Sequence, residues 1–555
     1  MSPLNGKVLH VAPSPSSRRV DFINTCEPHG SRCGYLPLLF TQTRAAGALP
    51  VTKSTRGSGW KSECRVSCVA WLSVFFLLCG CHNWQKSHET AIASYGHGDI
   101  QLSRTALKES QDKSRSEKKF LELDAGILDL ASGNVTQAEA RFRTLRRELE
   151  HLEQKDVTEQ ATSMMTDSRA VAYSGRDFER HMILNMALLT SVLGDGQDAF
   201  AYSLQATEAS NNRRTMLADA AKKAPEANVI VENAPAPDQL DVIAPVSHSV
   251  PRETANIFAS PIDQPLALSA YLSTSVQSEH SMRNDETEQA LSDIGFWNPA
   301  FCRHDQASSR GNFGTRCQPG NGTLHIITFV GKAPRWVSEV AEPTSAALLI
   351  ADRIISATGK HTLPPTLAPV RIACPELYGN TMPTGSVQCT IGQIGAPTAS
   401  SLPLSFSTAV DVNEVAIASY HEHRDQEIAQ AITRRVVKKG AVYVLKEAQN
   451  IHNNTFIDLG INIAGVAWEA MEQADTRSWR LLPARIDIAR TELPAGQWSA
   501  NLRLSHYGAS RGTQSFPVHI ENGRNTYVLC MIPDQQFTGN ILVGGADNAT
   551  IPVTP

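Results

Sequence analysis

The chain has 555 residues, of which 41% are hydrophobic and 19% charged, with 51 basic and 55 acidic side chains. This composition is that of globular proteins, and it excludes a wholly disordered chain, a collagen-like repeat and a protein with many membrane spans. The net charge of −4 gives no reason to expect a nucleic-acid binder, because such domains carry a basic excess. The length predicts roughly two to four domains.

Two different compositions meet near residue 81. Residues 1–65 hold nine basic and three acidic side chains, and residues 66–80 hold no charge. The chain after position 80 has 42 basic and 52 acidic side chains, a net charge of −10. Six of the 11 cysteines lie at or before position 81. The near-neutral total therefore combines a basic leader with an acidic body.

Residues 1–60 are rich in Ser, Pro, Arg and Gly and show no sustained periodicity. Such a segment cannot bury enough apolar surface to fold alone. We therefore expect either a disordered extension or a translation start placed too early, the true start being a residue such as Val51 or Val66.

Residues 61–81 have the pattern of a lipoprotein signal peptide. Lys61 and Arg65 precede the uncharged stretch VSCVAWLSVFFLLCG, which is short for a transmembrane helix and has the length of a signal h-region. Its end, Leu-Cys-Gly followed by Cys81, resembles a bacterial lipobox. The resemblance implies cleavage after Gly80, lipidation of Cys81 and a membrane anchor in the bacterial cell envelope. The alternative is an uncleaved signal anchor or a buried apolar helix.

The residue after the lipidated cysteine is His82. Aspartate at this position is associated with retention in the inner membrane of enteric bacteria. His82 therefore favours the outer membrane over the inner one, with the protein facing the periplasm.

Residues 82–210 show helical periodicity interrupted by Gly at positions 98, 133 and 194. The interruptions are separated by 35 and 61 residues, and the first spacing is close to the period of tetratricopeptide (TPR) repeats. This region resembles a short, degenerate TPR array with an insert; the alternative is a plain helical bundle. Apolar stripes are predicted at Leu121, Ala125 and Leu128, at Ala138, Phe142, Leu145, Leu149 and Leu152, and at Phe178, Met182, Met186, Leu189 and Leu193.

The rest of the chain predicts a linker and two further regions. Residues 211–265 are rich in Pro and Ala and are typical of an extended linker. Residues 266–475 predict a mixed α/β domain with strands at 324–330, 370–374 and 387–391 and a long helix at 413–448. Residues 476–555 predict a β-sandwich-like module, with Asn522-Gly523 as a hairpin turn. The expected fold class is therefore α+β and multidomain.

Five cysteines follow Cys81. Cys302 and Cys317 are fifteen residues apart, as are Cys374 and Cys389, and Cys530 belongs to neither pair. In an oxidising periplasm the two local pairs predict disulfides, each contributing about 3 kcal/mol by loop closure. The alternative is five reduced thiols, since spacing does not determine geometry.

No catalytic motif is present, and we nominate no catalytic, metal or cofactor residue. His421-Glu422-His423 places two imidazoles on different faces of a helix, which favours a solvated helix start over a metal site. The basic run Arg434, Arg435, Lys438 and Lys439 favours a solvated face or ion pairs over a ligand patch. Glu472, Asp475 and Arg477 predict a buried polar cluster with a structural role.

Three stretches carry a further resemblance: VNEVAIASYHEHRDQEIAQAITRRVVKKG, MEQADTRSWRLLPARIDIARTELPAG and GKAPRW. They resemble an uncharacterised family of bacterial TPR-containing lipoproteins, in which a lipobox, helical repeats, a middle region and a β-rich tail follow in this order. The resemblance covers most of residues 81–535 and is most specific at DTRSWRLLP. It implies architecture and location, and it names no site residues.

Two functions remain in competition. The first is a lipid-anchored scaffold or adaptor whose TPR-like helices bind a protein partner in the cell envelope. The second is an envelope enzyme or glycan-binding module within residues 266–555. Neither requires a cofactor or nucleic acid, and the sequence does not predict an oligomeric state.

Overall fold

The computed structural model describes most of the chain from Asn83 onward, and the contacts among its parts group Phe75–Pro555 as one unit. The described residues are 83–114, 117–163, 173–231, 260–279, 284–301, 317–357, 368–379, 382, 385–395, 401–448, 473–545 and 548–553. The predictions for residues 1–60, for the signal peptide at 61–81 and for Cys81 therefore lie outside the described residues. Within the described residues there are eleven helices and three sheets, so the α+β class is confirmed.

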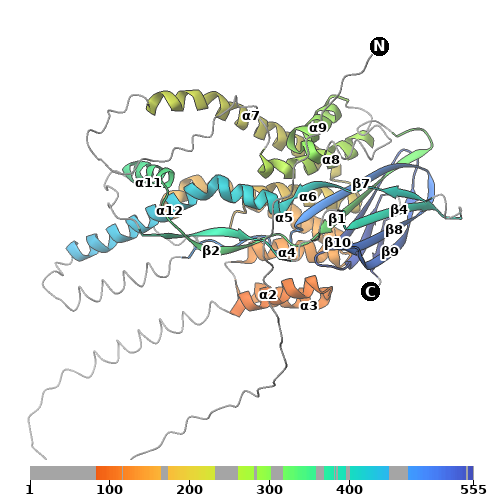
Figure 1. Cartoon of the computed structure of the whole chain (residues 1–555), viewed down its shortest axis with the longest axis horizontal. Helices are drawn as coiled ribbons and strands as arrows, with labels where there is room; N and C mark the ends of the chain where they lie inside the picture. The colour runs from red at the N-terminus through yellow and green to blue at the C-terminus, as the bar shows by residue number, and fades with distance from the viewer. Residues whose placement is uncertain are drawn as a thin grey trace, which may run out of the picture. The chain divides into compact units, whose positions relative to one another are not determined.

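Six helices at the start of the described chain form three antiparallel pairs (Figure 1). Gly98 and Gly133 close the first two turns with φ of +80° and +83°, a conformation that glycine adopts without steric cost. The predicted stripes are buried, from Leu121 to Leu193, except that Ala125 is half-buried and the side chain of Leu152 lies outside the described residues. The helices are α2 (Asn83–Gly96), α3 (Ile100–Lys113), α4 (Lys118–Ala131), α5 (Val135–Ser163), α6 (Asp177–Leu193) and α7 (Ala199–Val231).

Helix α7 continues into residues 211–231 of the predicted linker. It ends at Val231, and a 3-10 helix, η2 (Pro261–Asp263), already precedes residue 265. The contact between them is an ion pair, in which Arg213 Nε of α7 lies 2.7 Å from Asp263 Oδ1. Only residues 232–259 of the expected linker lie outside the described residues.

Two further helices, α8 (Gln264–Glu279) and α9 (Asn284–Trp297), pack beside the third helical pair. The side-chain amide of Asn185 in α6 donates to the Pro265 carbonyl at 2.8 Å. The Ser273 hydroxyl of α8 donates to the backbone carbonyl of Ser203 in α7 at 3.2 Å. On its other side α8 contacts a sheet, where the Tyr271 hydroxyl lies 2.7 Å from Nδ1 of the buried His325. Helix α8 is therefore enclosed, and nearly all its residues are buried.

The strands form a six-stranded sheet, a four-stranded sheet and a two-stranded ribbon. The six-stranded sheet has the order β12-β11-β10-β1-β7-β6, the four-stranded sheet β5-β4-β8-β9, and the ribbon pairs β2 with β3. The bounds are β1 (Asn321–Val330), β2 (Arg335–Ala341), β3 (Val370–Glu376), β4 (Val387–Gln393), β5 (Leu402–Leu404), β6 (Ser407–Asp411), β7 (Arg485–Pro494), β8 (Gly496–His506), β9 (Ala509–Ile520), β10 (Asn525–Ile532), β11 (Thr538–Gly544) and β12 (Ala549–Pro552). The strands predicted at 324–330, 370–374 and 387–391 are confirmed as β1, β3 and β4.

The six-stranded sheet is covered on both faces. Successive residues of a strand point to opposite sides, and in β1 Ile327 and Phe329 join the apolar cluster of the helices. Leu324 and Ile326 join a second cluster, together with side chains of β4, β8 and β9 from the four-stranded sheet. Helices α4 and α6 thus lie on one face of the six-stranded sheet and the four-stranded sheet on the other (Figure 1).

The predicted hairpin at Asn522-Gly523 is wrong in its pairing. The turn exists, with φ of +78° at Gly523, but β9 before it belongs to the four-stranded sheet and β10 after it to the six-stranded sheet. Strand β10 pairs in parallel with β1, Thr323 opposite Asn525. The turn therefore joins two packed sheets, and residues 476–555 complete neither sheet without β1, β4, β5 and β6.

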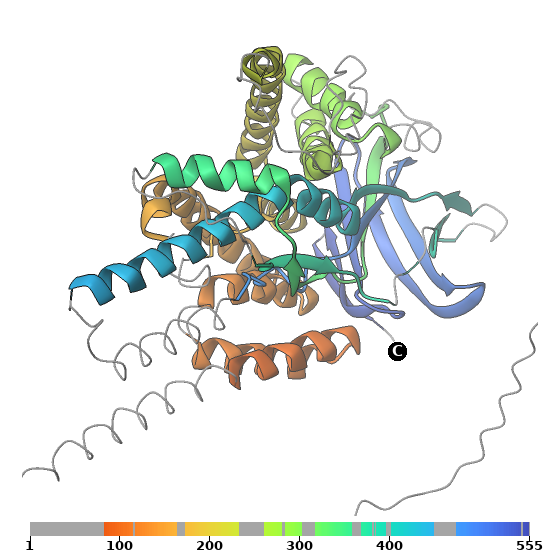
Figure 2. The ribbon, with the colours of Figure 1, turned by 60° about the vertical axis from the view of Figure 1, so that its left-hand side comes forward.

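The long helix predicted at 413–448 is confirmed as α12 (Val412–Ala448). Its residues Ile428, Ala431 and Ile432 pack against α11 (Ser345–Ala357) and β3 in a small separate core. Figure 2 shows α11 lying beside α12. Among the helices of the described residues, none combines the length and the apolar character needed to cross a membrane.

Candidate functional site

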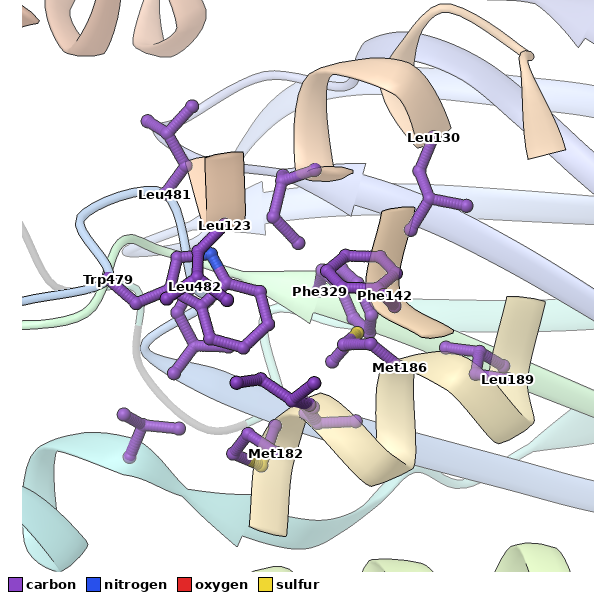
Figure 3. Packing of buried hydrophobic residues seen from close by; sticks show 14 of the residues in the cluster. Leu123, Leu130, Phe142, Met182, Met186, Leu189, Phe329, Trp479, Leu481 and Leu482 are labelled. Carbon is purple, nitrogen blue, oxygen red and sulfur yellow. The ribbon is translucent and has the colours of Figure 1, made fainter. Parts of the chain in front are cut away.

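Residues 475–482, here called the inner segment, lie against three of the paired helices. The Trp479 ring contacts the ring of Phe142 in α5, with 5.7 Å between their centroids. Leu481 and Leu482 join the same apolar cluster as Leu123 of α4, and Figure 3 shows these side chains together with Met182 and Met186 of α6. The inner segment, part of DTRSWRLLP, is therefore a component of the core.

Two buried carboxylates hold the backbone of the inner segment. Glu179 of α6 accepts from the Trp479 N–H at 2.8 Å, and Asp124 of α4 accepts from the Leu481 N–H at 2.7 Å. Burial raises the pKa of Glu179 above its ordinary value, opposed by its hydrogen bonds with the Arg176 and Trp479 amides and with Tyr173. Because an unpaired buried amide is costly, these carboxylates fix where the inner segment runs.

A groove of about 660 Å³ lies on another side of the same helices. Its apolar floor includes Leu149 of α5 and Ile183 and Leu184 of α6, all buried. At its edge Met216 of α7 is 64% exposed. We call this site the hairpin groove; its lining is Arg146, Leu149, Glu150, Asp177, Arg180, His181, Ile183, Leu184, Ala209, Asn212, Arg213, Met216, Ile262, Asp263, Glu422 and His423.

The rim of the hairpin groove carries charges of both signs, several of them paired. Arg180 lies 2.5 Å from Asp177, and His423 of α12 lies 3.5 Å from the other oxygen of Asp177. Burial, assisted by the positive charge of Arg180, lowers the pKa of His181 to about 4. At neutral pH His181 is therefore an uncharged hydrogen-bonding group. The groove suits a ligand with apolar and polar parts better than a strongly charged one.

The His421-Glu422-His423 motif lies within α12, nine residues after its first residue, Val412, and His421 and Glu422 are exposed. Glu422 and His423 line the hairpin groove, whereas His421 contacts the Tyr420 ring. His423 Nδ1 lies 2.9 Å from the Ser419 carbonyl one turn earlier. Among the described residues no three His, Cys, Asp or Glu side chains are grouped as metal ligands would be.

The polar cluster predicted near residue 475 is formed by Asp475 and Arg477. Arg477 Nη2 lies 2.6 Å from Asp475 Oδ2, and Nη1 lies 3.4 Å from Glu117 Oε2. The Arg477 side chain is only 4% exposed. Glu472, the third predicted member, lies outside the described residues.

The basic run at 434–439 divides between two roles. Arg434 lines a pocket beside α6. Arg435 donates to the carbonyls of Ala368 and Pro369 at 2.8 and 2.9 Å. The side chains of Lys438 and Lys439 lie outside the described residues.

The predicted disulfide between Cys374 and Cys389 is not formed in this structure, where both are free thiols. The reason is topological, because Cys374 lies on β3 of the ribbon and Cys389 on β4 of the four-stranded sheet. Burial raises the pKa of Cys374 to about 11 and that of Cys389 to about 12. For the other predicted pair, Cys302 lies outside the described residues, and Cys317 Sγ lies 3.1 Å from the Asn321 carbonyl.

Sequence reasoning missed Asp124 and Glu179, the two carboxylates that hold the inner segment. A signal was present, since Asp124 lies between Leu123 and Ala125, next to the predicted apolar stripe, and it is fully buried. A buried acid requires donors, but the sequence does not show that amides 300 or more residues away supply them.

No protein-family profile matches the chain, and neither the curated proteins nor the solved structures contain a match to it.

Proposed function

We propose that this protein is a lipid-anchored adaptor of the bacterial cell envelope, which binds a protein partner through its TPR-like helices. Support for the anchor comes from the lipobox-like end of the signal sequence at Cys81. Support for the adaptor role comes from three consecutive helical pairs with glycine in their turns, an arrangement typical of protein-binding repeat arrays. In this proposal the two packed sheets act as a β-sandwich-like base for the helices.

The inner side of the helical pairs is already occupied by the chain itself. Trp479 and Leu482 are 1% and 0% exposed there, and both ends of the contact are held by buried carboxylates. A partner that used this side would have to displace a segment of the core. The inner segment therefore directs the proposed binding to another side of the helices.

The observation that carries the proposal is the hairpin groove. It has a buried aliphatic floor, and its edge residue Met216 is one of the largest exposed apolar side chains among the described residues. Methionine is common at surfaces that accept varied apolar side chains. The matching occupant is a short segment of an envelope protein that inserts an apolar side chain over Leu149 and Ile183. The mixed charges of the rim then hydrogen-bond the backbone and polar groups of that segment.

Site-specific photocrosslinking in cells tests the proposal. A photoreactive residue at position 216 is expected to capture a discrete envelope protein. Position 349 is the matched control, because Leu349 is a comparably exposed aliphatic residue on helix α11, at 74%. Met216→Lys is expected to abolish capture from a neighbouring reporter at Asn212, whereas Leu349→Lys leaves it unchanged. Equal capture at positions 216 and 349, or none at 216, would contradict the adaptor role of the groove.

Palmitate labelling tests the anchor separately. Wild-type protein is expected to incorporate labelled palmitate and to fractionate with membranes. Cys81→Ser is expected to lose both, since the thiol of Cys81 is the proposed lipid acceptor. Equal labelling of the two proteins would contradict the anchor without bearing on the groove.

A further inference from the structure

A second, smaller pocket lies beside the start of α6 and contains an unusual number of arginines. Its volume is about 240 Å³, and Arg176, Arg371, Arg434 and Arg477 line it together with two acids, Glu427 and Asp475. These residues come from four parts of the chain: the residue before α6, strand β3, helix α12 and the inner segment. The fold therefore gathers four guanidinium groups around one small space, here called the arginine pocket.

Among the described residues that line the arginine pocket, four arginines stand beside two acids. Arg477 is engaged by Asp475 and Glu117. Glu427 lies 3.8 Å from Arg176, a loose contact. With Glu117, which contacts Arg477 from outside the pocket, these described residues comprise four arginines and three carboxylates. Burial also raises the pKa of Glu427, which favours its uncharged form and leaves the pocket more positive.

Arg176 is held in place by an aromatic ring. Its guanidinium carbon lies 3.3 Å from the centroid of the Trp336 ring, and Nη2 donates to the Asp475 carbonyl at 3.2 Å. The side chain is 16% exposed, and its buried Nε has no hydrogen-bond acceptor among the described residues. A guanidinium that is fixed by stacking loses little freedom when it binds an anion, which favours binding.

Arg371 supplies a free positive charge at the mouth of the pocket. It lies on the exposed side of β3, opposite Val340 of β2, and among the described residues it forms no ion pair. Removing its charge should leave the core intact, because its side chain is solvent-exposed.

We propose that the arginine pocket binds a small oxyanion, a carboxylate or phosphate group, through Arg176, Arg371 and Arg434. Guanidinium groups match the planar, two-oxygen geometry of carboxylates and the oxygens of phosphate. The volume is below that of most cofactor sites, so the pocket accommodates the charged group of a ligand with a short attachment. The acids at its wall disfavour ligands with several charges.

This inference is independent of the proposed function. Helix α12 lies between the two sites, with Glu427 in the arginine pocket and His423 in the hairpin groove. A failure to bind oxyanions therefore leaves the groove untouched, and a failure to capture a partner at position 216 leaves the arginine pocket untouched.

Calorimetric titration of the purified full-length protein in detergent tests the proposal, with succinate and inorganic phosphate as separate probes. Sodium chloride at matched ionic strength is the control for general screening. One or both probes are expected to bind saturably. Arg371→Gln is expected to weaken that binding about tenfold or more, since it removes hydrogen bonds between charged groups. Arg371→Lys should recover part of the affinity.

The matched control is Arg503→Gln. Arg503 is likewise an exposed arginine on a strand, β8, and does not line the pocket. The control protein should bind as tightly as wild type, and the probe that saturates identifies the oxyanion. The proposal is overturned if neither probe binds saturably, or if Arg371→Gln and Arg503→Gln bind alike.

Discussion

The paired helices present two sides that differ in how their polar groups are satisfied. On the inner side, Glu179 accepts an amide hydrogen of the chain's own inner segment. On the groove side, two residues further along the same helix, His181 lines an open space. Burial favours the neutral form of both groups, because it raises the pKa of Glu179 and lowers that of His181.

We infer from this difference that the inner side of the helices stabilises the fold and that the groove side binds a partner. The inner side is filled with side chains from distant parts of the sequence and contributes to folding. The groove has comparable helical walls and an apolar floor, but no segment of the described chain fills it. Changes on the inner side should therefore unfold the protein, whereas changes at the groove edge should alter binding alone.

The largest effect is expected for Trp479→Ala. Removing this fully buried ring from its contact with Phe142 leaves a cavity and should lower the free energy of unfolding by about 3–5 kcal/mol. Trp479→Phe should cost much less, since it also removes a buried indole N–H that has no acceptor among the described residues. Denaturant unfolding measures both, and an alanine variant as stable as wild type would show that the inner segment is not part of the core.

The second effect is the pH dependence that His181 contributes. Its folded-state pKa of about 4 lies below the ordinary value, so the unfolded chain binds the extra proton first. The stability that the neutral imidazole provides is present above pH ~6.5 and is lost as pH falls toward ~4, by up to ~3 kcal/mol. His181→Gln should remove this loss. Parallel stability curves for the two proteins between these pH values would contradict the lowered pKa of His181.

A smaller effect is expected where α4 and α5 approach closely. A Cβ added at Gly126 would collide with the Phe142 ring. Gly126→Ala should therefore destabilise the protein by about 1–2 kcal/mol, the strain exceeding the ~1 kcal/mol gain in helix propensity. Gly392 of β4 is the control, because no atom lies within 4 Å of its added Cβ. If thermal unfolding shows equal effects at both positions, the close helix approach is wrong.

The smallest effect on stability is expected at the groove edge. Met216→Ala should change the free energy of unfolding by less than about 0.5 kcal/mol, because the side chain is mostly exposed. The same change should reduce partner capture from position 212. A large loss of stability would place Met216 in the core and remove the contrast between the two sides.

Much of the local structure could be predicted from periodicity. The stripe from Ala138 to Leu149 is buried, and the helix expected at 413–448 begins one residue earlier, at Val412. Local patterns succeed here because an amphipathic helix must bury one face whatever its partner is.

What could not be predicted is which segments meet. Asn522-Gly523 has the local signature of a hairpin, yet the strands around it join different sheets, because β10 pairs with β1 some 200 residues away. Likewise, nothing in the sequence around Trp479 shows that its amide hydrogen bonds to Glu179, 300 residues earlier in the chain. The arginine pocket could not be predicted for the same reason. Of its four arginines, the sequence patterns point only to Arg434, in the basic run, and to Arg477, in the polar cluster.

Amide hydrogen exchange resolved to single residues tests the contrast between the two sides most directly. The amides of Trp479 and Leu481 are expected to exchange only through global unfolding, because buried carboxylates accept both hydrogens. They should match the slowest amides of β1 and β10 and respond equally to denaturant. Exchange of these two amides through a local opening, well before global unfolding, would contradict the account. The inner side would then be available to a partner.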